Sequence, residues 1–107
     1  MEGLWSVVFT APGHPTWHGV AVFVGDRVFG GDPFFYWSGK YTTEGGKLEG
    51  TLESTSHTGA PVGNIFGQIV AKYSMQLSAA VPASLAIGAS FTANGPGGLT
   101  ARLIRRA

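Results

Sequence analysis

The stretch that decides the fold is Gly3-Leu4-Trp5-Ser6-Val7-Val8-Phe9-Thr10, close to the start of the chain. Trp5, Val7 and Phe9 occupy every second position, and β-branched and aromatic residues dominate the segment. Alternation with a period of two predicts a strand over residues 4–10 that turns one face toward a core. A Gly-x-Trp on a first strand, followed by more short strands and a basic last strand, indicates a small antiparallel β-barrel with an inside to fill.

Seven further segments alternate in the same way between turns rich in glycine, proline and asparagine. We expect strands over residues 18–24, 27–30, 34–42, 47–57, 68–79, 85–93 and 99–106. Residues 58–67 are expected to form a loop with at most one short helical turn. Eight hairpin-linked strands in a single domain, residues 1–107, favour an all-β, antiparallel up-and-down barrel of the calycin or lipocalin-like type, because closure removes exposed edges. A β-sandwich is the alternative architecture.

The composition describes a folded domain whose surface carries few charges. Hydrophobic residues make up 44% of the 107-residue chain and charged residues 12%, with a net charge of +1 and no cysteine. A disulfide framework or a thiolate metal site is therefore impossible, and no electrostatic footprint for nucleic acid is present. The first residues carry an acid in place of lysines, and no stretch reaches the roughly 18 apolar residues of a membrane helix. We expect a cytoplasmic protein that contacts neither nucleic acid nor membrane.

The predicted inward rows mix bulky and very small side chains. An eight-stranded barrel is just wide enough to be filled by its side chains or to hold one small ligand. Large neighbours could fill the space beside the small residues, or the space could be an apolar pocket, and the sequence leaves both open. A pocket would be lined by eight large inward residues: Trp5, Phe9, Leu52, Tyr73, Met75, Leu77, Ile87 and Phe91.

Four consecutive aromatics, Phe34-Phe35-Tyr36-Trp37, form the second unusual feature. Strand alternation puts two of them on each face, so one pair cannot point into the barrel. We interpret this segment as an interface for self-association into a homodimer, since aromatics are enriched at interfaces. The alternative is that the loops over residues 12–16 or 58–67 cover it. Gly30, Gly31, Asp32 and Gly39 are predicted to be structural, with Asp32 bonding local backbone N–H groups.

The closed end of the barrel is expected at Trp5. An arginine of the last strand, Arg102 or Arg105, is predicted to lie over the Trp5 ring or to hydrogen-bond nearby backbone, tying the first strand to the last.

No group of residues suggests catalysis. His14, His18 and His57 lack a third converging ligand, so we expect solvated histidines and no metal. Glu49 and Glu53 share an outward strand face, where nothing would tune a carboxyl group for acid–base work. No cofactor is expected. We predict a protein that is not an enzyme, with use of the barrel as a reaction chamber for an isomerase or cyclase as a remote alternative.

The chain resembles a family of small bacterial proteins related to the Grl-type negative regulator of type III secretion. The resemblance covers essentially the whole chain and is carried by the following residues: Gly3 to Phe9, Gly19 to Val22, Gly30-Gly31-Asp32, Tyr36, Gly39, Tyr41, Phe66-Gly67 and Arg102 to Arg105. It implies a dimeric lipocalin-like barrel that acts in the cytoplasm by contact with a transcriptional activator. The acidic cluster that the family's repressor uses for this contact is replaced by Thr42-Thr43-Glu44-Gly45-Gly46-Lys47. We therefore expect a non-enzymatic regulatory protein, or alternatively a carrier or sensor of a small apolar ligand or lipid.

Overall fold

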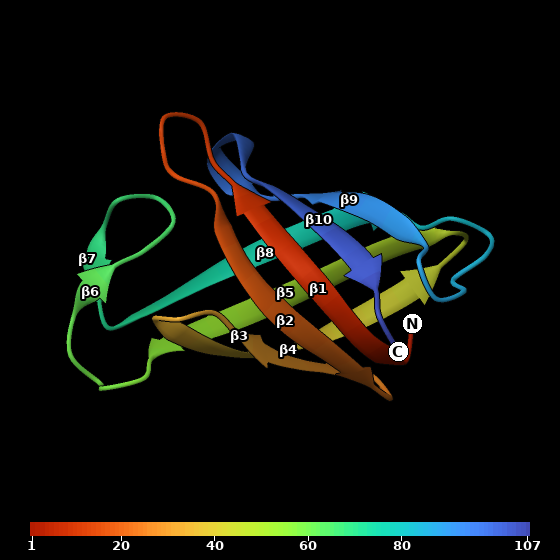
Figure 1. Cartoon of the computed structure of the whole chain (residues 1–107), viewed down its shortest axis with the longest axis horizontal. Coiled ribbons are helices and arrows are strands. Elements are labelled where there is room, and N and C mark those ends of the chain that lie inside the picture. Colours follow the sequence, from red (N-terminus) through yellow and green to blue (C-terminus); the bar gives the residue numbers. More distant parts are fainter.

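A computed structural model describes all 107 residues as a closed barrel of eight antiparallel strands with a two-stranded hairpin at one end (Figure 1). The order around the barrel is β1-β10-β9-β8-β5-β4-β3-β2, with β6 and β7 paired outside it. The predicted fold class is confirmed. The strands have these bounds: β1 Gly3–Thr10, β2 Trp17–Val24, β3 Arg27–Gly31, β4 Phe35–Glu44, β5 Lys47–Ser56, β6 Val62–Gly63, β7 Ile69–Val70, β8 Lys72–Ala80, β9 Ser90–Asn94 and β10 Thr100–Arg105.

Three sequence-based boundaries were wrong. The strand expected over residues 68–79 is two elements, because Ile69–Val70 pairs with β6 as β7 and only Lys72–Ala80 joins the barrel. The strand expected over 85–93 begins at Ser90, since Gly88 has a φ of +91° that breaks the extended chain. The one helical turn is a 3₁₀ turn at Pro96–Gly98, not within residues 58–67.

The core consists of the inward rows of the eight strands together with a few loop residues. On β1, Trp5, Val7 and Phe9 are buried as predicted. On β2, Ala21 and Phe23 point inward, whereas Val20 and Val24 are exposed on the outer surface. Both faces of β2 are apolar, so its alternation alone does not say which face the barrel encloses.

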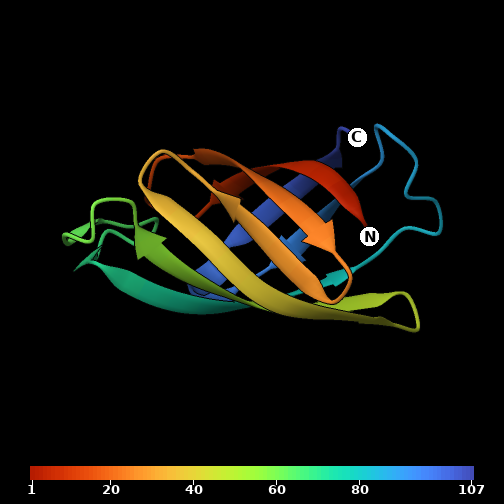
Figure 2. The ribbon, with the colours of Figure 1, turned by 90° about the horizontal axis from the view of Figure 1, so that it is seen from below.

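Both chain termini lie at the same end of the barrel (Figure 2), and Trp5 lies next to them, since it bonds Met1 and pairs opposite Arg105. The Trp5 ring is fully buried, packs edge-on against Phe23 and Phe91, and donates its Nε1–H to the Met1 carbonyl at 3.1 Å. Strands β1 and β10 pair with Trp5 opposite Arg105. Arg105 bonds backbone, as one of the predicted alternatives has it, but its side chain donates to the Ala107 and Leu85 carbonyls and does not reach β1. The prediction that Arg102 or Arg105 ties the first strand to the last was therefore wrong, and the side chain that reaches β1 is that of Arg106, which donates to the Ser6 hydroxyl at 2.9 Å.

Arg105 reaches the long loop between β8 and β9. Its guanidinium donates to the Leu85 carbonyl at 2.7 Å, and its backbone N–H donates to the Ala89 carbonyl at 2.9 Å. Gly88 donates back to the Arg105 carbonyl at 2.9 Å. Arg102 instead donates to the Ser90 hydroxyl. The loop over residues 81–89 is thus fastened to the last strand by one arginine.

The opposite end of the barrel is covered by the loop between β6 and β7, which projects to the left in Figure 1. Ile65, at the tip of this loop, is buried in the core. The Asn64 side chain shapes the turn, because its Oδ1 accepts the N–H groups of Phe66 at 3.0 Å and Gln68 at 2.9 Å. The hydrogen bonds of Asn64 therefore stabilise a turn that directs the apolar side chain of Ile65 into the barrel.

Candidate functional site

The inside of the barrel is almost completely filled. The remaining space is about 40 Å³, against the roughly 300–1,000 Å³ of a pocket for a drug-sized ligand. It is lined almost entirely by apolar side chains from all eight barrel strands, among them Val7, Phe9, Phe23, Val28, Leu52 and Leu103. A fatty acid or similar molecule has no room there without rearrangement of the core.

Glycines on the inner face explain why the barrel is full. A Cβ at Gly19 would lie 2.6 Å from Cη2 of Trp37, and one at Gly30 would lie 2.9 Å from its Cε3. The indole of Trp37 therefore occupies the volume that these two glycines leave, and Phe9 packs edge-on against it at 5.1 Å between ring centroids. Small residues on the inward rows provide space that neighbouring rings use.

The residues predicted to line a pocket do not gather around one space. Phe9, Leu52 and Leu77 line the small residual cavity. Trp5, Met75 and Phe91 are buried elsewhere in the core, and Tyr73 is half-buried toward the end that Ile65 covers. The assignment of Ile87 to the interior was wrong: it is 73% exposed, because the chain at residues 81–89 is a surface loop and not the start of a strand.

Tyr73 is the one strongly perturbed titratable group. Its ring packs edge-on against Phe35 at 5.0 Å and Phe66 at 6.4 Å between centroids. Burial raises the pKa of Tyr73 to about 12, and the negative charge of Asp32 adds to the effect. A phenol with a raised pKa stays neutral under physiological conditions, which fits a packing role and not an acid–base role.

The Tyr73 pKa predicts a loss of stability at high pH. A tyrosine in the unfolded chain ionises near pH 10, whereas folded Tyr73 keeps its proton until about pH 12. The stabilisation is therefore complete below about pH 10 and is lost as the pH rises to about 12. Because the ring is partly exposed, we expect a loss of about 1–2 kcal/mol in the free energy of unfolding. Urea unfolding between pH 9 and 12 should show a smaller decline for Tyr73→Phe than for the parent, and Tyr41, whose pKa is also raised by burial, accounts for part of what remains. An equal decline in the variant would contradict the role of Tyr73.

The aromatic segment alternates between the two faces of β4. Phe35 and Trp37 are 0% and 3% exposed inside the barrel, so their assignment to an interface was wrong. Phe34 and Tyr36 point outward and are 52% and 49% exposed. Trp17, which follows the loop over residues 12–16, packs against Phe34 at 5.3 Å between centroids without covering it.

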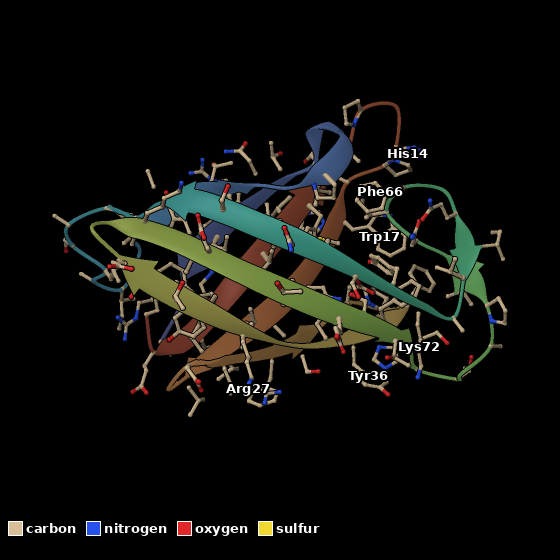
Figure 3. The ribbon with its side chains drawn as sticks, turned by 180° about the vertical axis from the view of Figure 1, so that it is seen from behind. His14, Trp17, Arg27, Tyr36, Phe66 and Lys72 are labelled. Carbon is tan, nitrogen blue, oxygen red and sulfur yellow. The ribbon has the colours of Figure 1, made fainter.

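Phe34 and Tyr36 belong to a larger set of exposed apolar side chains on neighbouring strands, and Figure 3 shows Tyr36 pointing outward from the barrel. One row across the strands runs from Val20 on β2 through Gly31 on β3 to Tyr36 on β4. The neighbouring row runs from Leu4 on β1 through Val22 on β2 to Phe29 on β3. We call this surface the apolar face and define it by its exposed large residues: Leu4, Val20, Val24, Phe29, Phe34 and Tyr36. Only the last two are predictable from the sequence, because nothing in the alternation of β2 and β3 distinguishes an outward valine or phenylalanine from an inward one.

The Gly30-Gly31-Asp32 turn sets the direction in which the aromatic segment leaves β3. The Asp32 Oδ1 accepts the N–H groups of Phe34 and Phe35, each at 2.8 Å, which confirms the predicted role. The Asp32 carbonyl lies 2.9 Å from Nε2 of His57. Gly39 is structural as well, because a Cβ there would overlap the carbonyl oxygen of Thr51. The turn is held by the hydrogen bonds of Asp32 with the backbone of the aromatic segment and with the His57 side chain.

The outer surface of β4, β5 and β8 is polar and forms an open groove of about 1,040 Å³. Its lining is dominated by hydroxyl, amide and charged side chains, including Lys40, Thr42, Glu49, Thr51, Ser74, Gln76 and Asn94. His14, His18 and His57 are all exposed, and no three His, Asp or Glu side chains come together in a geometry that could hold a metal ion.

The structure contains no helix long and apolar enough to cross a membrane. No family model matches this chain, and no curated protein matches it in sequence. The geometry of the chain itself is therefore the basis for a functional assignment, together with the residues that carry the resemblance.

Proposed function

We propose that this chain is a non-enzymatic regulatory protein of the Grl-type negative-regulator kind, which acts in the cytoplasm through protein–protein contact and forms a homodimer. The observation that supports this proposal most strongly is the position of the apolar surface. Large apolar side chains are exposed together on the outside of β1 to β4, while the inside of the barrel is filled. A continuous exposed apolar patch marks an interaction site more often than an inert surface.

A second copy of the chain fits the apolar face better than an unrelated surface would. Val20 and Tyr36 lie on either side of Gly31, which has no side chain, and the outward Phe29 ring lies two residues before it on the same strand. Two such faces related by a two-fold axis can place a ring of one copy over the glycine position of the other, as an isologous interface requires. Arg27 lies 5.5 Å from the centroid of the Phe29 ring and gives the face a polar margin.

A transcriptional activator is the further protein partner suggested by the resemblance. The turn at Glu44 to Lys47 carries one acid and one lysine, which form no acidic cluster. We propose that contact with an activator uses surface outside this turn.

Carriage of a small apolar ligand is less well supported as a function. The residual space of about 40 Å³ is too small for a lipid, and Ile65 is packed into the end through which one would enter. No observation on the interior favours a cargo over a packed core.

The homodimer is tested by adding charge to the apolar face. Phe29→Lys combined with Tyr36→Lys should give a folded monomer by light scattering, because each lysine would have to be desolvated in the interface. Thr42→Lys, on the exposed outer side of β4 away from the apolar face, is the matched control and should remain a dimer. A folded double variant that still elutes as a dimer would place the interface elsewhere, and a monomeric parent protein would contradict the homodimer.

A further inference from the structure

The barrel has one weak seam, between β8 and β9. Strand β8 pairs with β5 along its whole length, from Lys72 opposite Thr55 to Ala80 opposite Lys47. On its other side, β8 pairs with β9 only at Ser78 opposite Asn94. In Figure 3, the half of β8 nearer Lys72 has no strand beside it on the side away from β5. One edge of the sheet is thus left open in a barrel that otherwise closes on itself.

The chain around Pro96 explains why β9 stops short. Continuing the register from Ser78 and Asn94 would bring Gln76 opposite Pro96, which has no N–H to donate. The chain then turns away through the 3₁₀ turn Pro96–Gly98 to start β10. The open edge is therefore built into the sequence at this position.

The turn between β4 and β5 determines which backbone groups point into the open edge. Gly45 and Gly46 have φ angles of +60° and +75°, as in a two-residue type I′ hairpin, so Glu44 and Lys47 form a hydrogen-bonded pair. Hydrogen-bonded and non-hydrogen-bonded pairs alternate along an antiparallel ladder. The even-numbered residues of β5 consequently direct their backbone groups toward β8.

Two hydrogen bonds at the ends of the ladder agree with this assignment. The Ser56 N–H donates to the Ala71 carbonyl at 2.8 Å, and the Val81 N–H donates to the Gly46 carbonyl at 2.8 Å. The partners of the even-numbered β5 residues are the odd-numbered residues of β8. The residues of β8 that point their N–H and C=O groups away from β5, in the unpaired half, are therefore Lys72, Ser74 and Gln76. None of them has a backbone hydrogen bond outside the strand ladders, and all three are exposed.

The side chains around this edge differ on its two faces. Tyr73 and Leu77 line the inner side and are only half-buried, whereas Ser74 and Gln76 lie on the outer side in the polar groove. Lys72 has no acidic partner, since the one ion pair in the structure joins Lys47 to Glu49. The edge therefore offers apolar contact inside, polar contact outside and an unmatched positive charge at one end.

We propose that this edge of β8 binds an extended polypeptide segment, which adds to the sheet as an antiparallel strand. Its apolar side chains pack toward Tyr73, beside Phe66, its polar side chains lie over Ser74 and Gln76, and an acidic side chain pairs with Lys72. Main-chain hydrogen bonds to an open edge supply affinity in this binding mode, and alternate side chains supply specificity. A second copy of the chain fits less well, because a two-fold pairing of β8 edges centred on Ser74 would leave Lys72 opposite Gln76.

The probe is the peptide acetyl-Val-Thr-Val-Thr-Val-Asp-amide, which places its threonines opposite Gln76 and Ser74 and its aspartate opposite Lys72. Amide exchange measured by NMR should be fast at these three residues in the free protein and slow in the complex. The Met75 amide, already bonded to β5, should be slow in both states. The same peptide with N-methyl groups on its two threonines cannot donate to the edge and should produce no change.

Variants on the edge separate strand addition from simple surface adhesion. Ser74→Pro removes an N–H that the fold does not use, so the protein should stay folded while affinity for the peptide falls at least about tenfold. Ser74→Ala keeps the N–H and should bind like the parent. Lys72→Glu should weaken binding, and a peptide with lysine in place of aspartate should restore it.

Three results would overturn the inference. The first is slow exchange of the Lys72, Ser74 and Gln76 amides in the free protein, which would mean that another copy already pairs with the edge. The second is the absence of protection of these amides at millimolar peptide. The third is peptide binding that Ser74→Pro leaves intact. The test is independent of the homodimer, because Phe29→Lys combined with Tyr36→Lys alters a different surface and should bind the peptide as the parent does.

Discussion

Replacing Trp37 with alanine is expected to lower the free energy of unfolding by about 3–5 kcal/mol, the range for loss of a large aromatic from a packed core. The Trp37 indole is enclosed by Phe9 and by the backbone at Gly19 and Gly30, and glycines have no side chain with which to refill the space. Chemical denaturation measures the loss. Thr42→Ala, on the same strand but exposed on its outer side away from the apolar face, is the control and should cost about 1 kcal/mol or less.

The same variant would turn a filled barrel into a hollow one. If Trp37→Ala remains folded, indole should bind in the volume that the ring vacates. The variant should then regain part of the lost thermal stability, because a ligand that binds only the folded state stabilises it. A Trp37→Ala protein as stable as the parent, or one indifferent to indole, would mean that the indole does not fill the barrel as described.

Replacing Gly30 with alanine is expected to be nearly as damaging as the loss of Trp37. A Cβ at Gly30 would overlap the carbonyl oxygen of Val20 and press on the Trp37 ring, and the Val20 carbonyl belongs to the β2–β3 ladder and cannot move freely. We expect a loss of about 3 kcal/mol or failure to fold, at the upper end of overpacking effects. Thermal unfolding followed by circular dichroism provides the measurement.

Gly63→Ala is the matched control for Gly30→Ala. Gly63 also lies in a strand, but the nearest atom to a Cβ there is the Ile69 Cδ1 at 3.8 Å, an ordinary contact. The control should stay within about 0.5 kcal/mol of the parent protein. Equal effects of the two substitutions would contradict the role given to Gly30.

The strands and most inward rows were predictable because alternation on β1, β5 and β10 contrasts apolar with polar positions. The same rule does not orient β2, where Val20 and Phe23 are on opposite faces and equally apolar. The contents of the barrel were not predictable from residue sizes, since the space at Gly19 on β2 and Gly30 on β3 is filled by the ring of Trp37, which lies on β4. How a ring fills the space beside a glycine depends on which residues face each other across the strands, and the strand register determines those pairs.

The aromatic segment shows how far the pattern extends toward function. Period two correctly required that two of its four rings point outward, and Phe34 and Tyr36 do. The full apolar face also includes Leu4, Val20 and Phe29, which come together only because β1 to β4 are neighbours in the closed sheet. The open edge of β8 likewise depends on the position of Pro96 relative to Gln76, a relation that exists only once the strands are paired.

Native mass spectrometry of the protein, purified without denaturant, tests the central claim most directly, because it reports assembly and cargo in one spectrum. The account predicts a dimer whose mass equals two polypeptide chains with no bound small molecule. A monomer that carries an apolar ligand, released when the protein is unfolded, would contradict it.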